Sequence, residues 1–79
     1  MKTIRYATDA LRALRKHRAQ AAFITAKIER YAETGAGDVA KLVGQPASRL
    51  RAGDYRVIFQ ETATEISVLA IGPRGEIYD

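Results

Sequence analysis

The sequence contains no cysteine and only one histidine, His17. Without cysteine it can form neither a disulfide framework nor a cysteine-ligated zinc, haem or iron–sulfur site. One histidine cannot by itself build a histidine-rich metal site, so we expect neither a metal nor any other cofactor. The lack of cysteine also fits a reducing cytosol, and we expect a cytoplasmic protein.

Long apolar runs and the common catalytic motifs are missing too. The apolar runs are too short to span a bilayer, and residues 1–7 are too few and too charged for a signal peptide. The sequence has no G-x-x-x-x-G-K-[ST], H-E-x-x-H or G-x-S-x-G, and no G-x-G-x-x-G after a predicted strand. A Ser-His-Asp triad would have to use His17, which we expect on the exposed surface of a basic helix.

What is present is enough for one small domain. The chain has 79 residues, of which 47% are hydrophobic, so it can bury a core but is too short for two domains. A domain of this size buries only about 60% of the surface that its unfolded chain exposes. We therefore expect modest stability.

Positive charge is unevenly distributed along the chain. The 13 lysines and arginines exceed the 9 acidic residues, for a net charge of +4. Six basic residues fall in 1–18 and four in 41–56, with one acid in each segment, whereas 57–79 holds one basic residue and four acids. Two basic zones on a small domain are typical of a protein that binds phosphates, and we expect a polyanion, most simply RNA, as the ligand.

The first half of the chain is predicted to form a strand and two helices. Residues 2–7 alternate between apolar and polar side chains, as in a short strand. Thr8 can cap a helix over about 9–18, and apolar residues at helical spacing predict a second helix over 20–34 that Gly35 ends. The two helices would form an antiparallel hairpin; one continuous helix is the alternative, because no residue between them breaks a helix.

In the second half the period changes to two. Strands are predicted at Ser48–Ala52, Tyr55–Glu61 and Glu65–Ile71, the last of them central because it is apolar on both faces. Gly53-Asp54 is a two-residue hairpin signal. Glu76–Tyr78 is predicted to be a last short edge strand.

The fold class that follows is α+β, with the element order β-α-α-β-β-β. An N-terminal strand and a helical hairpin would pack on a three- to four-stranded antiparallel sheet, because the helix pair is the only cover for the sheet's apolar face. Segment 39–42 is predicted to be a short turn capped by Asp38. Periodicity leaves open whether the first strand joins the sheet at an edge or beside another strand.

Several arginines and a tyrosine lie on or beside the predicted strands: Arg49, Arg51, Arg56, Arg74 and Tyr78. Arg49 and Arg51 point the same way, and the hairpin register decides whether Arg56 joins them. Guanidinium groups bind phosphates through a planar fork and can stabilise a pentacovalent phosphate. Such a set could cut RNA without metal, with the substrate 2′-OH as nucleophile, although an ordinary exposed strand face has the same composition.

Three blocks of the sequence resemble the RelE/ParE superfamily of bacterial toxins. Arg49–Phe59 is similar to R-x-R-x-G-x-Y-R followed by hydrophobic residues. Ile66–Gly72, an arginine and then Glu76–Tyr78 are similar to a strand ending in glycine, a basic residue and E-[VI]-Y. Lys41–Pro46 resembles the K-L-x-G-x-P that often precedes them. The likeness is greatest to the RelE branch and extends over essentially the whole chain.

The resemblance implies a single RelE-like toxin domain over residues 1–79. It would be the toxin of a type II toxin–antitoxin system, a metal-independent, ribosome-dependent mRNA endoribonuclease (an mRNA interferase) that inhibits translation. Its partners would be a cognate antitoxin protein, the ribosome and mRNA, with no membrane, and the complex with antitoxin would bind operator DNA.

The resemblance also implies residue roles. Arg56 would hold the scissile phosphate, Arg74 would stabilise the transition state, and Tyr78 would take part in proton transfer and stack on a base. The other basic residues of the matched blocks are expected to bind RNA: Lys41, Arg49 and Arg51.

Two other functions remain open for the sequence. One is a ParE-like inhibitor of DNA gyrase, and the other is a non-catalytic RelE-fold binding protein. A gyrase inhibitor would not need Arg56, Arg74 and Tyr78 together, so their joint presence favours the endoribonuclease.

Overall fold

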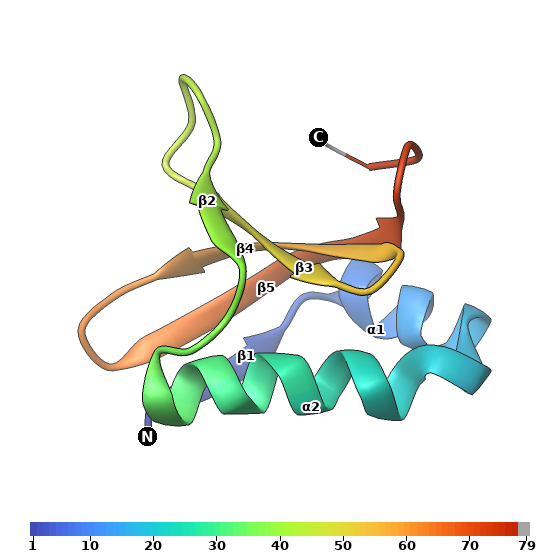
Figure 1. The fold of residues 1–79 in the computed structure, drawn as a ribbon, viewed down its shortest axis with the longest axis horizontal. Coiled ribbons are helices and arrows are strands. Elements are labelled where there is room, and N and C mark those ends of the chain that lie inside the picture. Colours follow the sequence, from blue (N-terminus) through green and yellow to red (C-terminus); the bar gives the residue numbers. More distant parts are fainter. Residues whose placement is uncertain (78–79) are drawn as a thin grey trace.

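A sheet lies on two helices in the computed structural model, which describes residues 1–77 (Figure 1). The elements in chain order are β1 (Thr3–Tyr6), α1 (Thr8–Lys16), α2 (Arg18–Thr34), β2 (Val39–Lys41), β3 (Ser48–Ala52), β4 (Tyr55–Glu61) and β5 (Glu65–Pro73). Among the described residues, neither helix has the length and apolar character that a membrane crossing requires.

The five strands of the sheet are arranged in the order β1-β5-β4-β3-β2. Strands β2 to β5 pair antiparallel with their neighbours. Strand β1 pairs parallel with β5, from Thr3 opposite Glu65 to Tyr6 opposite Val68. The α+β class with helices packed on the sheet is confirmed, β5 lies inside the sheet as predicted, and β1 joins at an edge. The sheet is mixed and has one strand more than the sequence predicted.

The additional strand is β2, where the sequence predicted a short turn. Val39 lies opposite Leu50 of β3, and the backbone N–H of Arg51 donates to the carbonyl of Asp38 over 2.9 Å. Asp38 therefore anchors an edge strand to β3 and caps no helix. Three residues are too few to show the alternation by which a strand is recognised in sequence.

The C-terminal segment also differs from its prediction. Residues 74–76 form a turn and Ile77 a bend, so the described part of Glu76–Tyr78 is not a strand. Strand β5 instead extends to Pro73, which pairs with Tyr55 of β4. Tyr78 lies outside the described residues.

The helices end where the backbone leaves the helical region. His17 has φ −108° and ψ 54° and separates α1 from α2, so the alternative of one continuous helix is wrong. Gly35 has φ 77°, the left-handed conformation that favours glycine, and its N–H donates to the carbonyl of Tyr31 over 2.8 Å. Gly35 thus ends α2 as predicted.

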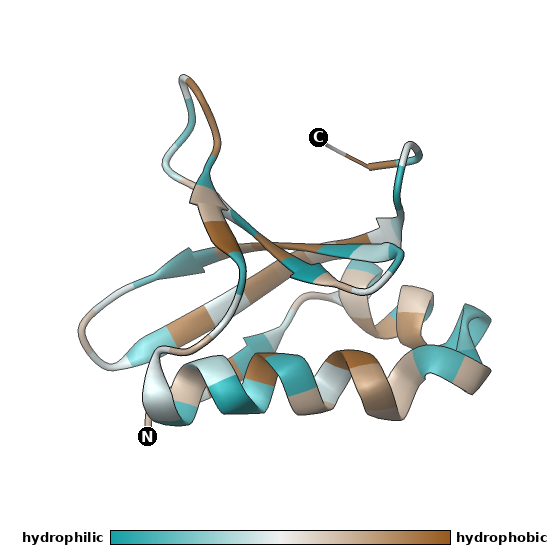
Figure 2. Cartoon of the chain, viewed as in Figure 1, coloured by the Kyte–Doolittle hydropathy of each residue, from teal (hydrophilic) through white to brown (hydrophobic). Residues whose placement is uncertain are grey.

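The core lies between the helices and one face of the sheet. Figure 2 shows hydrophobic and hydrophilic residues alternating along β5 and α2. The largest fully buried side chains come from α2 and from β3, β4 and β5: Ile24, Ile28, Leu50, Val57, Phe59, Ile66 and Val68. Because period-two strands place alternate residues on opposite faces, the positions that flank buried Leu50 and Val57, among them Arg49, Arg51 and Arg56, point away from the helices.

Candidate functional site

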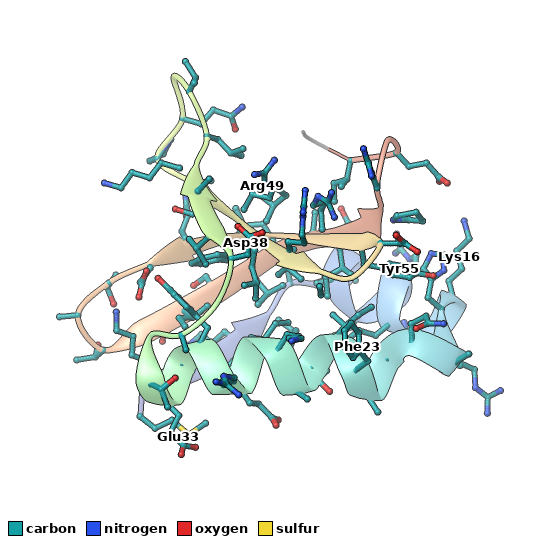
Figure 3. All side chains as sticks on the ribbon, in the orientation of Figure 1. Lys16, Phe23, Glu33, Asp38, Arg49 and Tyr55 are labelled. Atoms are coloured by element: carbon teal, nitrogen blue, oxygen red, sulfur yellow. The ribbon has the colours of Figure 1, made fainter. Side chains whose placement is uncertain are left out.

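The β3–β4 hairpin settles which arginines share a face. Arg51 lies opposite Arg56, and Arg49 lies opposite Ile58. Partners on antiparallel strands point to the same side of a sheet, so these three arginines all lie on the side away from the helices, which we call the open face. Figure 3 shows Arg49 on the side of the sheet away from α2. The question that the sequence left open is thus answered by the register.

Arg74 follows the end of β5 and lies against the same hairpin. Its backbone N–H donates to the carbonyl of Asp54 over 2.7 Å. Gly72, two residues earlier, lies opposite Arg56. The backbones that carry Arg56 and Arg74 therefore meet at one end of the sheet, where β4 starts and β5 stops.

Arg56 is buried, with 3% of its surface exposed. Its Nη1 donates to the carbonyls of Gly53 and Tyr55, each over 3.1 Å. Gly72 lies opposite Arg56 on the same face. A Cβ added to Gly72 would lie 3.6 Å from the side chain of Ile77, so Ile77 packs beside Arg56. Arginine is almost never fully buried unless it is paired, and nothing in the sequence signals this burial.

The positive charge that reaches solvent on the open face comes from its other arginines. Arg51 is exposed, and its Nε lies 3.6 Å from a carboxylate oxygen of Asp38. Arg49 is half-buried, and its Nε has no hydrogen-bond partner within residues 1–77. With exposed Arg74 at the rim, the arrangement can attract and hold a phosphodiester.

Two of the predicted site residues do not join this group in the structure. Lys41 is exposed, but it lies opposite Ser48, which in turn lies opposite core-facing Phe59. The register therefore places Lys41 on the helix side of the sheet, not on the open face. Tyr78 lies outside the described residues, so its roles stay a prediction.

His17 is placed differently from the expectation of an exposed helix residue. It is half-buried, and its Nδ1 lies 3.1 Å from the Tyr55 hydroxyl. The two rings meet edge to face, with centroids 5.0 Å apart. No helix breaker in the sequence marked this position, so nothing could have indicated the contact. Within residues 1–77, no three His, Cys, Asp or Glu side chains gather as metal ligands would.

A second polar cluster lies at the other end of β4. The Tyr31 hydroxyl donates to one carboxylate oxygen of Glu61 over 2.7 Å, and the Lys2 ammonium donates to the other. The hydrogen bond from Lys2 lowers the pKa of Glu61. Burial, together with the hydrogen bond to Glu61, raises the pKa of Tyr31 to about 12. This cluster joins three segments of the chain: α2, the residues before β1, and the end of β4.

Solved structures with the same fold are bacterial and archaeal toxin structures. A chain of the RelE–RelB complex from Pyrococcus horikoshii superposes with a TM-score of 0.76 at 24% identity, over 96% of this chain and 98% of that one. The H87Q mutant of YafQ from E. coli gives a TM-score of 0.79 at 9% identity, over all of both chains. A chain of the RelBE2 toxin–antitoxin complex from Mycobacterium tuberculosis gives 0.69 at 23%, over 92% and 98%.

These comparisons define the class of fold. No protein-family model and no curated protein sequence matches the chain. At identities of 24% and below the superpositions show the fold alone, and that fold is the one shared by RelE-like toxins. The RelE-like fold expected from the sequence motifs is thereby confirmed.

Proposed function

We propose that this protein is the toxin of a type II toxin–antitoxin pair and that it cleaves mRNA on the ribosome. The observation that carries the proposal is the gathering of Arg49, Arg51 and Arg56 on one open face, with Arg74 at the adjoining strand end. Fold alone does not determine function, but a polyanion ligand accounts for a sheet face that collects arginines.

The proposed reaction needs no metal. The 2′-oxygen of the substrate bonds to the adjacent phosphorus, the 5′-oxygen leaves, and the products carry a 2′,3′-cyclic phosphate and a 5′-hydroxyl. The protein must balance the negative charge of the pentacovalent phosphate and move a proton from the 2′-hydroxyl to the leaving oxygen. Arg74 would stabilise the charge of the pentacovalent phosphate, and exposed Arg51 would hold the RNA beside it. The sequence predicted that Arg56 holds the scissile phosphate; because Arg56 is buried, we assign it that role as a fixed positive charge beside the phosphate. Tyr78 would take part in proton transfer.

The proposed partners follow from the same assignment. The solved structures of this fold include complexes of RelE with RelB and of DinJ with YafQ. We assign this chain a cognate antitoxin as well, whose acidic surface would neutralise the basic face. The ribosome and mRNA would be its targets, and the complex with antitoxin would bind operator DNA.

Arg74→Ala tests the assigned site. Arg74 is exposed and its side chain has no role in the core, so the variant should fold normally and lose at least about 100-fold in cleavage, the usual range for a group that stabilises transition-state charge. The measurement is induction in cells followed by mapping of mRNA 5′ ends, where cuts in phase with codons are expected. Arg15→Ala, an exposed arginine in the helical layer, is the matched control.

Other outcomes reject the proposal. Full toxicity of Arg74→Ala would show that the assigned site is wrong. Intact mRNA together with blocked supercoiling by gyrase would establish the ParE-like function. Arg56→Ala is a weaker test, because loss of a buried guanidinium bound to two carbonyls should also lower stability.

A further inference from the structure

The β3–β4 turn, residues 53–55, is held by two side chains from the helical layer. A Cβ on Gly53 would lie 3.1 Å from Cε2 of Phe23, so the Phe23 ring packs directly beneath the turn. The Tyr55 hydroxyl lies 3.1 Å from Nδ1 of His17, the residue between α1 and α2. Figure 3 shows Tyr55 and Phe23 at the end of the sheet where the turn meets α2.

The same turn also holds both candidate catalytic arginines. Nη1 of Arg56 donates to the carbonyls of Gly53 and Tyr55, each over 3.1 Å. The carbonyl between them, that of Asp54, accepts the backbone N–H of Arg74 over 2.7 Å. Three consecutive carbonyls therefore fix the guanidinium of one arginine and the backbone of the other. A displacement of the turn would move both arginines.

We propose that His17 and Tyr55, with Phe23, are positioning residues for the Arg56–Arg74 pair. They would hold the turn against the helices, and the turn would hold the two arginines in one relative placement. This inference rests on the proposed function, because it gives the turn a role in RNA cleavage. Catalytic groups need placement to within about 0.5 Å. Within residues 1–77, the turn contacts both arginines, the junction between the helices at His17, and α2 at Phe23.

The His17–Tyr55 contact suits this role because its geometry allows a hydrogen bond with either tautomer of the imidazole. Neutral His17 with its proton on Nε2 accepts from the Tyr55 hydroxyl at Nδ1, and a protonated Nδ1 donates to the hydroxyl oxygen. Both rings are half-buried. Removing the single hydroxyl should therefore loosen the turn and leave the core packing in place.

The test compares two tyrosines that each make one phenolic hydrogen bond. Tyr55→Phe removes the bond to His17 at the turn, and Tyr31→Phe removes the bond to Glu61 at the far end of β4. For Tyr55→Phe and His17→Ala we expect kcat of RNA cleavage to fall about tenfold with KM unchanged. We also expect the Arg74 amide to exchange with solvent about tenfold faster, after correction for global stability. Tyr31→Phe should alter neither quantity.

The double variant His17→Ala/Tyr55→Phe completes the experiment. Its kcat should equal that of either single variant, because both changes break one interaction. Additive losses, or an Arg74 amide that exchanges equally in Tyr55→Phe and Tyr31→Phe, would overturn the positioning role. If the wild-type protein cuts no RNA, the proposed function fails by itself, whereas the amide-exchange comparison still decides whether His17 and Tyr55 fix the turn.

Discussion

At the scale of single residues, Glu61 shows how one carboxylate can join three segments of the chain. It accepts hydrogen bonds from Tyr31 of α2 and from Lys2 just before β1. The side chains of Lys2 and Glu61 are 28% and 29% exposed, so solvent screens the pair only in part. Its contribution should therefore lie at the upper end of the range for surface ion pairs.

Glu61→Gln should lower the free energy of unfolding by about 1 kcal/mol at neutral pH, since it removes the charge that Lys2 binds. The folded-state pKa of Glu61 lies below its ordinary value of 4.5. The stabilisation is therefore present above about pH 4.5 and is lost as the pH falls through the folded-state pKa. Urea titrations of both proteins should differ at pH 7 and converge in acid; a constant difference at all pH values would contradict this assignment.

For Tyr31 we expect the opposite pH dependence of stability, at alkaline pH. Its pKa is raised from 10.0 to about 12, so the neutral phenol stabilises the fold below pH 10 and that stability is lost as the pH rises toward 12. The thermal unfolding temperature of the wild type should fall as the pH rises from 10 to 12. Tyr31→Phe, which has no proton to lose, should show a smaller decline; an equal decline would assign the effect to other groups.

At the scale of elements, the strands that flank a recognisable turn were the ones that the sequence predicted correctly. Strands β3 and β4 have the predicted bounds because their period-two alternation flanks the Gly53-Asp54 turn, whose glycine has φ 61°. Strand β2 was missed because it is only three residues long. Its extended conformation is fixed by hydrogen bonding to β3, which the local sequence does not show. The parallel partner of β1 was not predictable either, since a pattern of alternation carries no direction.

The same contrast applies to the site. The sequence placed Arg49 and Arg51 on one side of a strand, and the hairpin register added Arg56. Burial of Arg56 and the contact of His17 with Tyr55 depend on segments far apart in the chain. Local sequence patterns contain no information on such contacts.

Gly35 gives a prediction for the end of α2. Its φ of 77° disfavours any residue with a Cβ, although nothing lies within 4 Å of where that Cβ would be. Gly35→Ala should therefore destabilise the protein by about 1 kcal/mol through backbone strain alone. Gly35→Asn should cost less, because asparagine adopts this conformation more readily. Denaturant unfolding checks both, and an Ala variant as stable as the wild type would show that α2 can end in another way.

At the scale of the whole molecule, the protein is a two-layer structure with its helices on one side and its arginine-bearing open face on the other (Figure 1). If RNA binds the open face, each arginine that neutralises a phosphate should contribute about 0.7 to the slope of log affinity against log salt for a single strand. Arg51→Ala should therefore weaken RNA binding and reduce the slope by about that amount. Arg15→Ala should change the slope less, and equal changes for both variants would place RNA elsewhere.

The parallel pairing of β1 with β5 also constrains the order of events during synthesis. Thr3–Tyr6 are synthesised before their hydrogen-bonding partners at Glu65–Val68, and both helices and three strands lie between the two segments. Until those partners are made, the first strand has no sheet edge to join, and contacts so distant in sequence form slowly. The first strand can therefore take its place in the sheet only after β5 has been synthesised.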